Sequence, residues 1–178
     1  SNIQYFDPII FFHLIKHSDS FHVYIITYRL DHYLAAQALR GFASELAARH
    51  GLAVQVEPEL REIAFGQWEG ISYQDMREKH QQAFSDFFQD PVNNTPPGAE
   101  PLLECQRRVN AAWDELIARR HGKHLLVVAH GAVIRIICSR ILDTPARAMF
   151  RLEVPYASLT RVRCLPEGER IVFHGKTA

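Results

Sequence analysis

The stretch LLVVAHGAVIRIICSRIL, residues 125–142, constrains the fold of this chain more than any other segment. Its first five residues, Leu125–Ala129, are apolar and rich in β-branched side chains, as in a strand buried on both faces of a sheet. From Ala132 onward the apolar residues recur at helical spacing, with basic residues between them. The segment therefore predicts a strand, a tight turn at His130–Gly131 and a helix.

This junction is also a candidate anion site. His130 falls at the carboxyl end of the predicted strand, which is where ligands bind in open α/β sheets. The N–H groups of Gly131 and Ala132, at the positive end of the helix dipole, are directed to the same place. We expect these three residues to bind an anion. The alternative is a hydrogen-bonded core histidine, which is the commoner state of a histidine in apolar surroundings.

The rest of the chain alternates helical and extended patterns without an internal repeat. Helices are expected over Tyr33–His50 with Gly51 as a left-handed stop, over Ser72–Gln89 with Ser72 as the cap, and over Glu100–Arg120. Further strands are expected over Ala53–Val56, Arg151–Val154, Leu159–Arg163 and Ile171–His174, and loops over Leu60–Gly70 and Asp90–Gly98. The pattern predicts an α/β fold, a three-layer α/β/α sandwich whose central sheet is mostly parallel and has Leu125–Ala129 as a central strand.

Composition narrows the class of protein. The 178 residues, 47% of them hydrophobic, suit a single domain spanning 1–178. Basic and acidic side chains balance at twenty each, which argues against nucleic acid and membrane surfaces as partners. The three cysteines show no CxxC pairing, the apolar run Ile9–Ile15 is too short to span a bilayer, and no signal peptide is recognisable. We therefore expect a cytoplasmic protein.

Four motifs occur in an order that resembles the histidine phosphatase superfamily, the phosphoglycerate mutase-like group. They are LREIAFGQWEG at 60–70, PPGAE at 96–100, VVAHGAVIR at 127–135 and RLEVPYASLTRVR at 151–163. The last is most similar to the superfamily's α-ribazole phosphatases, which act late in cobalamin synthesis. The resemblance covers roughly Phe42 to Val172, and ordered motifs are a stronger signal than any one alone.

The resemblance implies a phosphoglycerate mutase-like fold and a phosphatase that works through a phosphohistidine, without cofactor or metal. By motif, Glu62 falls at the proton-donor position, His130 at the second histidine, and Glu100 at the supporting acidic residue of the family's Gly-Glu-Ser-type loop. The chemistry suits these residues, because neutral imidazole is nucleophilic near pH 7 and helix N-termini stabilise phosphoryl charge. Taken alone, Glu62 is more readily explained as an ordinary solvated loop carboxylate beside Arg61, and Trp68 is expected to pack in support of the loop.

A metal site formed by His121, His124 and His130 is disfavoured. The first two fall at a predicted helix end and strand start, which does not bring three ligands together.

The N-terminal part, residues 1–41, departs from the family pattern. Family members begin with a strand ending in Arg-His-Gly, which carries the nucleophile; the nearest analogue here is Lys16-His17-Ser18. Lysine lacks the bidentate fork of arginine, and serine lacks the backbone freedom of glycine. The place of a second family arginine is held by Ala38, with Arg40 two residues away. We assign His17 as nucleophile and Lys16 and Arg40 as phosphate-binding residues.

Two alignments of this region stay open. Either the chain lacks a segment between the two motifs, or LDHYLAAQALRGF matches the family's first helix and the deletion follows it. Permissive codons for Tyr33–Leu39, read one base later, spell Ile-Ser-Pro-Pro-Arg-Arg-Cys, which places an arginine at position 38. A frameshift or damaged gene is therefore a further hypothesis, and the nucleotide sequence tests it.

Two functions follow from these residues. The first is a phosphomonoesterase acting on a small phosphorylated metabolite such as α-ribazole 5′-phosphate, as a monomer or homodimer. The second is a weakly active or inactive phosphate-binding relative, because the nucleophile motif is degenerate.

Overall fold

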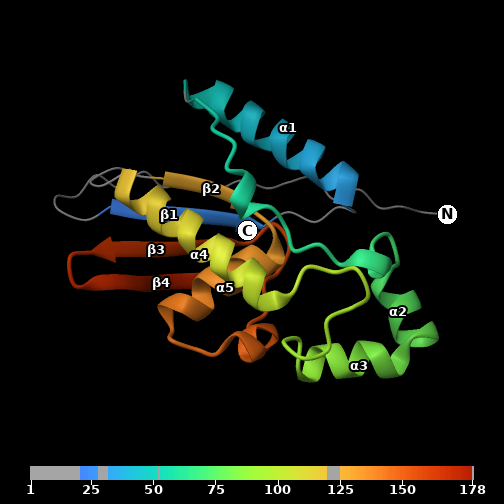
Figure 1. Ribbon diagram of the computed structural model, residues 1–178. Coiled ribbons are helices and arrows are strands. Elements are labelled where there is room, and N and C mark those ends of the chain that lie inside the picture. Colours follow the sequence, from blue (N-terminus) through green and yellow to red (C-terminus); the bar gives the residue numbers. More distant parts are fainter. Residues whose placement is uncertain (1–20, 28–31, 52, 120–124, 178) are drawn as a thin grey trace.

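The computed structural model describes residues 21–27, 32–51, 53–119 and 125–177 (Figure 1). Its strands are β1 (Phe21–Thr27), β2 (Leu125–Ala129), β3 (Leu159–Leu165) and β4 (Gly168–Lys176). Its α-helices are α1 (His32–His50), α2 (Tyr73–Lys79), α3 (Gln81–Gln89), α4 (Leu102–Arg119) and α5 (Gly131–Ile141). Three short 3₁₀ helices are η1 (Pro58–Leu60), η2 (Gly66–Trp68) and η3 (Ala146–Arg151).

The described strands form one sheet in the order β2-β1-β3-β4. β1 and β2 are parallel, with Thr27 opposite Ala129, whereas the β1–β3 and β3–β4 pairs are antiparallel. Within the described strands the expectation of a mostly parallel sheet with a central β2 is therefore wrong. For the β3–β4 pair the physical reason is the two-residue turn Pro166–Glu167, which can join only antiparallel neighbours. In addition, the sequence reading did not predict β1, which lies beside β2.

The core lies between the sheet and the two helices α4 and α5, which cover one of its faces (Figure 1). α5 contributes Val133, Ile136 and Ile137, all at most 2% exposed, at the spacing that the sequence predicted. Trp113 of α4 and Val162 of β3 are completely buried against the same cluster. α1 lies beside β2 (Figure 1).

Several predicted ends are confirmed. Gly51 has φ +62° directly after α1, and the hydroxyl of Ser72 accepts the Asp75 N–H at 3.0 Å at the start of α2. α4 begins at Leu102 rather than Glu100, because Pro101 disfavours helical backbone in the residue that precedes it.

Three predicted elements differ from the structure. Residues 53–57 form no strand, and Val54 and Val56 are 45% and 62% exposed. Residues 151–154 comprise the end of η3 and an irregular segment. The Leu152 carbonyl accepts a hydrogen bond from Arg135 Nε, so it is not available to a neighbouring strand.

The predicted helix Ser72–Gln89 is divided in two at His80, where φ is −131°. The break directs α3 so that buried Phe87 meets Phe65, Trp68 and Phe150 in edge-on or tilted ring contacts. Trp68 thus supports its loop by packing, as predicted.

Candidate active site

The strand–helix junction at His130 has the predicted geometry. β2 ends at Ala129, and His130 is the N-cap of α5 with extended backbone (φ −95°, ψ 169°). Its side chain is half-buried. The first N–H groups of α5 start at Gly131, so the histidine and the positive end of the helix dipole lie together at the carboxyl edge of the parallel pair.

Glu62 reaches this junction from a different part of the chain. Its Oε2 accepts the Ala132 N–H at 3.3 Å, and its Oε1 accepts the N–H of Ile63 at 3.0 Å. The carboxylate is half-buried and stands at a helix N-terminus, where negative charge is stabilised. The structure therefore brings together two residues, seventy positions apart in sequence, that were predicted separately as the acid and as an anion-binding N–H.

Arg135, which the sequence reading did not assign, lies over the same helix end. A Cβ atom on Gly131 would stand 2.9 Å from its Nη1, so the guanidinium occupies the space above that glycine. Its Nε donates to the Leu152 carbonyl at 3.0 Å, and its Cζ lies 5.6 Å from the centroid of the Phe150 ring. Burial lowers the pKa of Arg135, and the carboxylate of Glu62 acts in the opposite direction. The sequence feature that could have identified Arg135 is a basic residue one helical turn after His130–Gly131.

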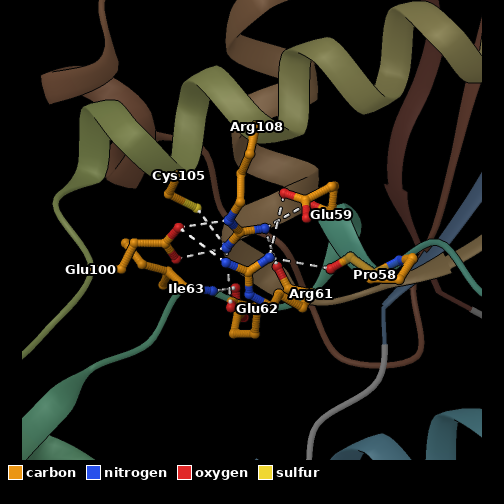
Figure 2. Close-up of polar contacts among 8 residues, drawn as sticks. All are labelled: Pro58, Glu59, Arg61, Glu62, Ile63, Glu100, Cys105 and Arg108. Atoms are coloured by element: carbon orange, nitrogen blue, oxygen red, sulfur yellow. Dashed lines mark hydrogen bonds and ion pairs between the residues drawn. The ribbon is translucent and has the colours of Figure 1, made fainter.

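Glu100 forms a bidentate ion pair with Arg108 of α4 (Figure 2). Arg108 Nε donates to Oε1 at 2.6 Å and Nη2 donates to Oε2 at 2.7 Å. These bonds hold the pKa of the Glu100 carboxyl below its usual value, although burial opposes the shift. The sequence reading assigned Glu100 as a supporting residue but missed Arg108. The signal was an arginine on the apolar face of α4, between Cys105 and Val109.

The two loops that carry Glu62 and Glu100 also contact each other directly. The Gln67 N–H donates to the Pro97 carbonyl at 3.0 Å, and the Glu100 N–H donates to the Ala64 carbonyl at 2.9 Å. Gly66, at φ +58°, allows this approach, because a Cβ there would stand 2.4 Å from Gly98 C and Pro97 O. The LREIAFGQWEG and PPGAE motifs are therefore parts of one structural unit.

The described part of the structure places none of the other assigned residues at this site. Lys16 and His17 lie outside the described residues, as do His121 and His124. Arg40 belongs to α1, but its side chain lies outside the description. Among the described residues no group of three His, Cys, Asp or Glu side chains is placed to hold a metal ion.

Fold and site together define an α/β protein in which a carboxylate bonds to the N-terminus of a helix whose N-cap is a histidine. Residues 37–177 match the family model of the histidine phosphatase superfamily (branch 1). The chain therefore belongs to the histidine phosphatase superfamily, and the α/β, phosphoglycerate mutase-like fold class predicted from the sequence is confirmed.

Relatives and solved structures agree with this assignment. The adenosylcobalamin/alpha-ribazole phosphatase of Escherichia coli is 30% identical over 103 residues, which is 58% of this chain and 51% of that protein. The bifunctional protein Rv2228c of Mycobacterium tuberculosis is 30% identical over 131 residues, 72% of this chain and 36% of that protein. The structure of Bacillus stearothermophilus YhfR is similar with a TM-score of 0.75 at 20% identity, covering 89% of this chain and 98% of that one.

The matched part of the chain thus spans about a third to a half of these two curated relatives. No helix that the structure describes is long and apolar enough to cross a membrane.

Proposed function

We propose that the chain is a phosphomonoesterase that works through a phosphohistidine intermediate. The observation that carries the proposal is the Glu62 carboxylate on the Ala132 N–H, beside His130 at the end of β2. Membership of a family of phosphatases and mutases supports the reaction class. The substrate is a small phosphorylated metabolite, and the similarity to the alpha-ribazole phosphatase of E. coli makes α-ribazole 5′-phosphate the first compound to test.

The reaction divides into two displacements at phosphorus. A histidine nitrogen attacks phosphorus while the bond to the leaving oxygen breaks, and Glu62 gives its proton to that oxygen. Water then attacks the phosphohistidine, Glu62 takes a proton from it, and phosphate leaves. His130, the N–H groups at the start of α5 and the guanidinium of Arg135 stabilise the negative charge on the phosphoryl oxygens. Our assignment of the nucleophile stays His17, with Lys16 and Arg40 binding phosphate and Glu100 supporting the acid.

The enzyme acts in the cytoplasm as a monomer or homodimer, without a cofactor, metal, nucleic acid or membrane as partner. The balanced charge and the cysteine pattern of the sequence support this part of the proposal.

A second candidate is a phosphate-binding relative without turnover. Two observations favour it, and the first is that the family match begins at residue 37, after Lys16 and His17. Moreover, β1, the parallel neighbour of β2, is followed in sequence by Tyr28-Arg29-Leu30 and not by Arg-His-Gly, and His17 precedes β1.

Trapping the covalent intermediate separates the two candidates. The protein is incubated with a radiolabelled phosphomonoester, quenched in alkali, where phosphohistidine survives, and digested to locate the label. A labelled histidine in the wild type, lost in His17→Ala, establishes the enzyme and its nucleophile. Label that persists in His17→Ala assigns the nucleophile elsewhere. No label, together with calorimetric binding of inorganic phosphate, establishes the phosphate-binding relative.

A further inference from the structure

We propose that Arg108 is a positioning residue that sets where the Glu62 carboxylate lies, and that Glu100 acts through Arg108. The inference deepens the proposed function and rests on it for the role of Glu62 as the acid. It starts from one buried side chain, which bonds to the loop segment Glu59–Glu62 and to Glu100 at the same time (Figure 2).

The guanidinium of Arg108 is committed entirely to the protein. Besides its two bonds to Glu100, Nη1 donates to the carbonyls of Glu59 at 2.6 Å and Arg61 at 2.9 Å. Nη2 also donates to the carbonyl of Glu62 at 3.2 Å and contacts Cys105 Sγ at 3.3 Å. A guanidinium has five N–H donors, and these contacts occupy all of them. Arg108 therefore has no donor left for a substrate and acts through the residues it holds.

Three of its partners are main-chain carbonyls in and around the residue that carries the acid. The segment leaves η1 at Leu60 and continues without regular structure to Phe65, so no helix or strand ladder fixes its backbone. The Arg108 bonds substitute for such a ladder. They fix the backbone of Arg61 and Glu62, from which the Glu62 side chain extends to the Ala132 N–H.

Glu100 makes this arrangement possible. Arg108 is only 7% exposed, and a buried charge is costly unless it is paired. The bidentate carboxylate supplies the opposite charge and fixes the plane of the guanidinium, which leaves Nη1 aimed at the loop. A lysine at position 108 cannot replace Arg108, because an ammonium group is a point charge without a planar fork.

The test observes the Glu62–Ala132 contact and needs no turnover. The amide shifts of ¹⁵N-labelled full-length chain are followed by NMR as pH is varied. In the wild type the Ala132 amide should follow the ionisation of Glu62, and in Glu62→Gln that dependence should vanish. In Arg108→Lys and Arg108→Gln we expect the pH dependence of the Ala132 amide shift to be lost, or reduced at least about twofold, while the other amide shifts are retained.

Arg140→Gln is the matched control. Arg140 also links its helix to distant segments, through the Asn110 carbonyl, Asp114 and Glu169, but none of its bonds reaches the Glu62 loop. This variant should keep the Ala132 titration even though it loses stability. If Arg108→Gln does not fold, Glu100→Gln serves instead, because it keeps the guanidinium and removes its anchor. A wild-type Ala132 titration in folded Arg108 or Glu100 variants would overturn the proposal.

Kinetics give a second readout. A misplacement of about 1 Å can cost on the order of 10²-fold in rate. We expect Arg108→Lys to lower kcat for an alkyl phosphate by tenfold or more at unchanged KM, and to change p-nitrophenyl phosphate hydrolysis much less. A wild type that shows the Ala132 titration but hydrolyses neither ester contradicts the proposed function and leaves the positioning role of Arg108 standing.

Discussion

At the scale of single residues, the contact between Glu62 and Ala132 carries the most chemical information. A carboxylate at a helix N-terminus is stabilised as an anion, yet a general acid must deliver a proton. The contribution of Glu62 to the rate should therefore depend on the basicity of the leaving oxygen, because only a basic leaving oxygen requires a proton to depart.

The first prediction concerns this acid. Glu62→Gln should slow hydrolysis of an alkyl phosphate by about 10²–10⁴-fold, the usual range for general acid help. It should change hydrolysis of p-nitrophenyl phosphate much less, because nitrophenolate leaves without a proton. Steady-state rates with both esters are the measurement. Glu59→Gln is the control, an exposed carboxylate in η1, three residues before Glu62; equal slowing of both esters by Glu62→Gln would contradict the assignment.

The second prediction concerns the histidine. His130→Ala should weaken binding of inorganic phosphate by about 1.5–3 kcal/mol, the value of one hydrogen bond to a charged group. Isothermal titration calorimetry measures it, and His50→Ala, at the exposed end of α1, is the control. Equal affinities in wild type and His130→Ala would remove His130 from the site.

At the residue level the sequence predicts positions where a motif fixes them and not where tertiary contacts decide; the catalytic roles assigned to those positions stay predictions. His130 and Glu62 follow from a strand end and a motif. Arg108 and Arg135 take their roles from partners far away in sequence, such as the Glu59 carbonyl 49 residues before Arg108. No local pattern encodes such a pair.

At the scale of elements, the loops around Gly66 and Gly98 cross in close contact near the site. The third prediction uses it. Gly66→Ala should lose roughly 1–2 kcal/mol for its left-handed backbone and about 1–3 kcal/mol more for the contact with Gly98. Urea unfolding measures the loss.

Gly70→Ala is the matched control, because Gly70 has φ +77° and nothing within 4 Å of a Cβ. It should show the conformational loss alone. Equal losses in the two variants would mean that the loop contact does not constrain the fold.

Helices and strands, like single residues, were predicted where the sequence signal is local and missed where tertiary contacts decide. α1, α4, α5 and the β3–β4 hairpin were found because their periodicity or turn residues are local. Residues 53–57 and 151–154 resemble strands locally but find no pairing partner among the described residues, and the break at His80 depends on where Phe87 packs. β1 was not predicted, although Phe21–Thr27 is rich in β-branched residues.

At the scale of the whole molecule, the pairing of Glu100 with Arg108 makes stability depend on pH, which is the fourth prediction. The pKa of Glu100 is lower in the folded state than its ordinary value of 4.5. Its stabilisation is therefore complete above pH 4.5 and is lost as pH falls from there through the folded-state pKa.

Urea unfolding of wild type and Glu100→Gln between pH 3 and 7 measures this dependence, and the difference between them should shrink as the medium becomes acidic. Glu115→Gln, which breaks an exposed pair with Arg119, should stay close to wild type throughout. A constant difference between wild type and Glu100→Gln across this range would contradict the prediction.

The fifth prediction concerns the thiols. Cys105, Cys138 and Cys164 are all buried and free, and burial raises the pKa of each to about 12. Since the thiolate is the reactive form, iodoacetamide at pH 8 should modify none of them in the folded protein and all of them in urea. Mass spectrometry counts the modified thiols. Rapid modification of one cysteine under native conditions would show that its surroundings open without global unfolding.

The carboxylate of Glu62 on the Ala132 N–H has one further consequence. In the proposed function a phosphoryl oxygen binds at this helix end, whose Ala132 N–H already donates to the Glu62 carboxylate. A phosphate ester that binds there would therefore have to compete with Glu62 for this N–H. In the proposed reaction the displaced carboxylate lies beside the newly bound ester, where it must first take up a proton, from the ester or from solvent, before it can protonate the leaving oxygen.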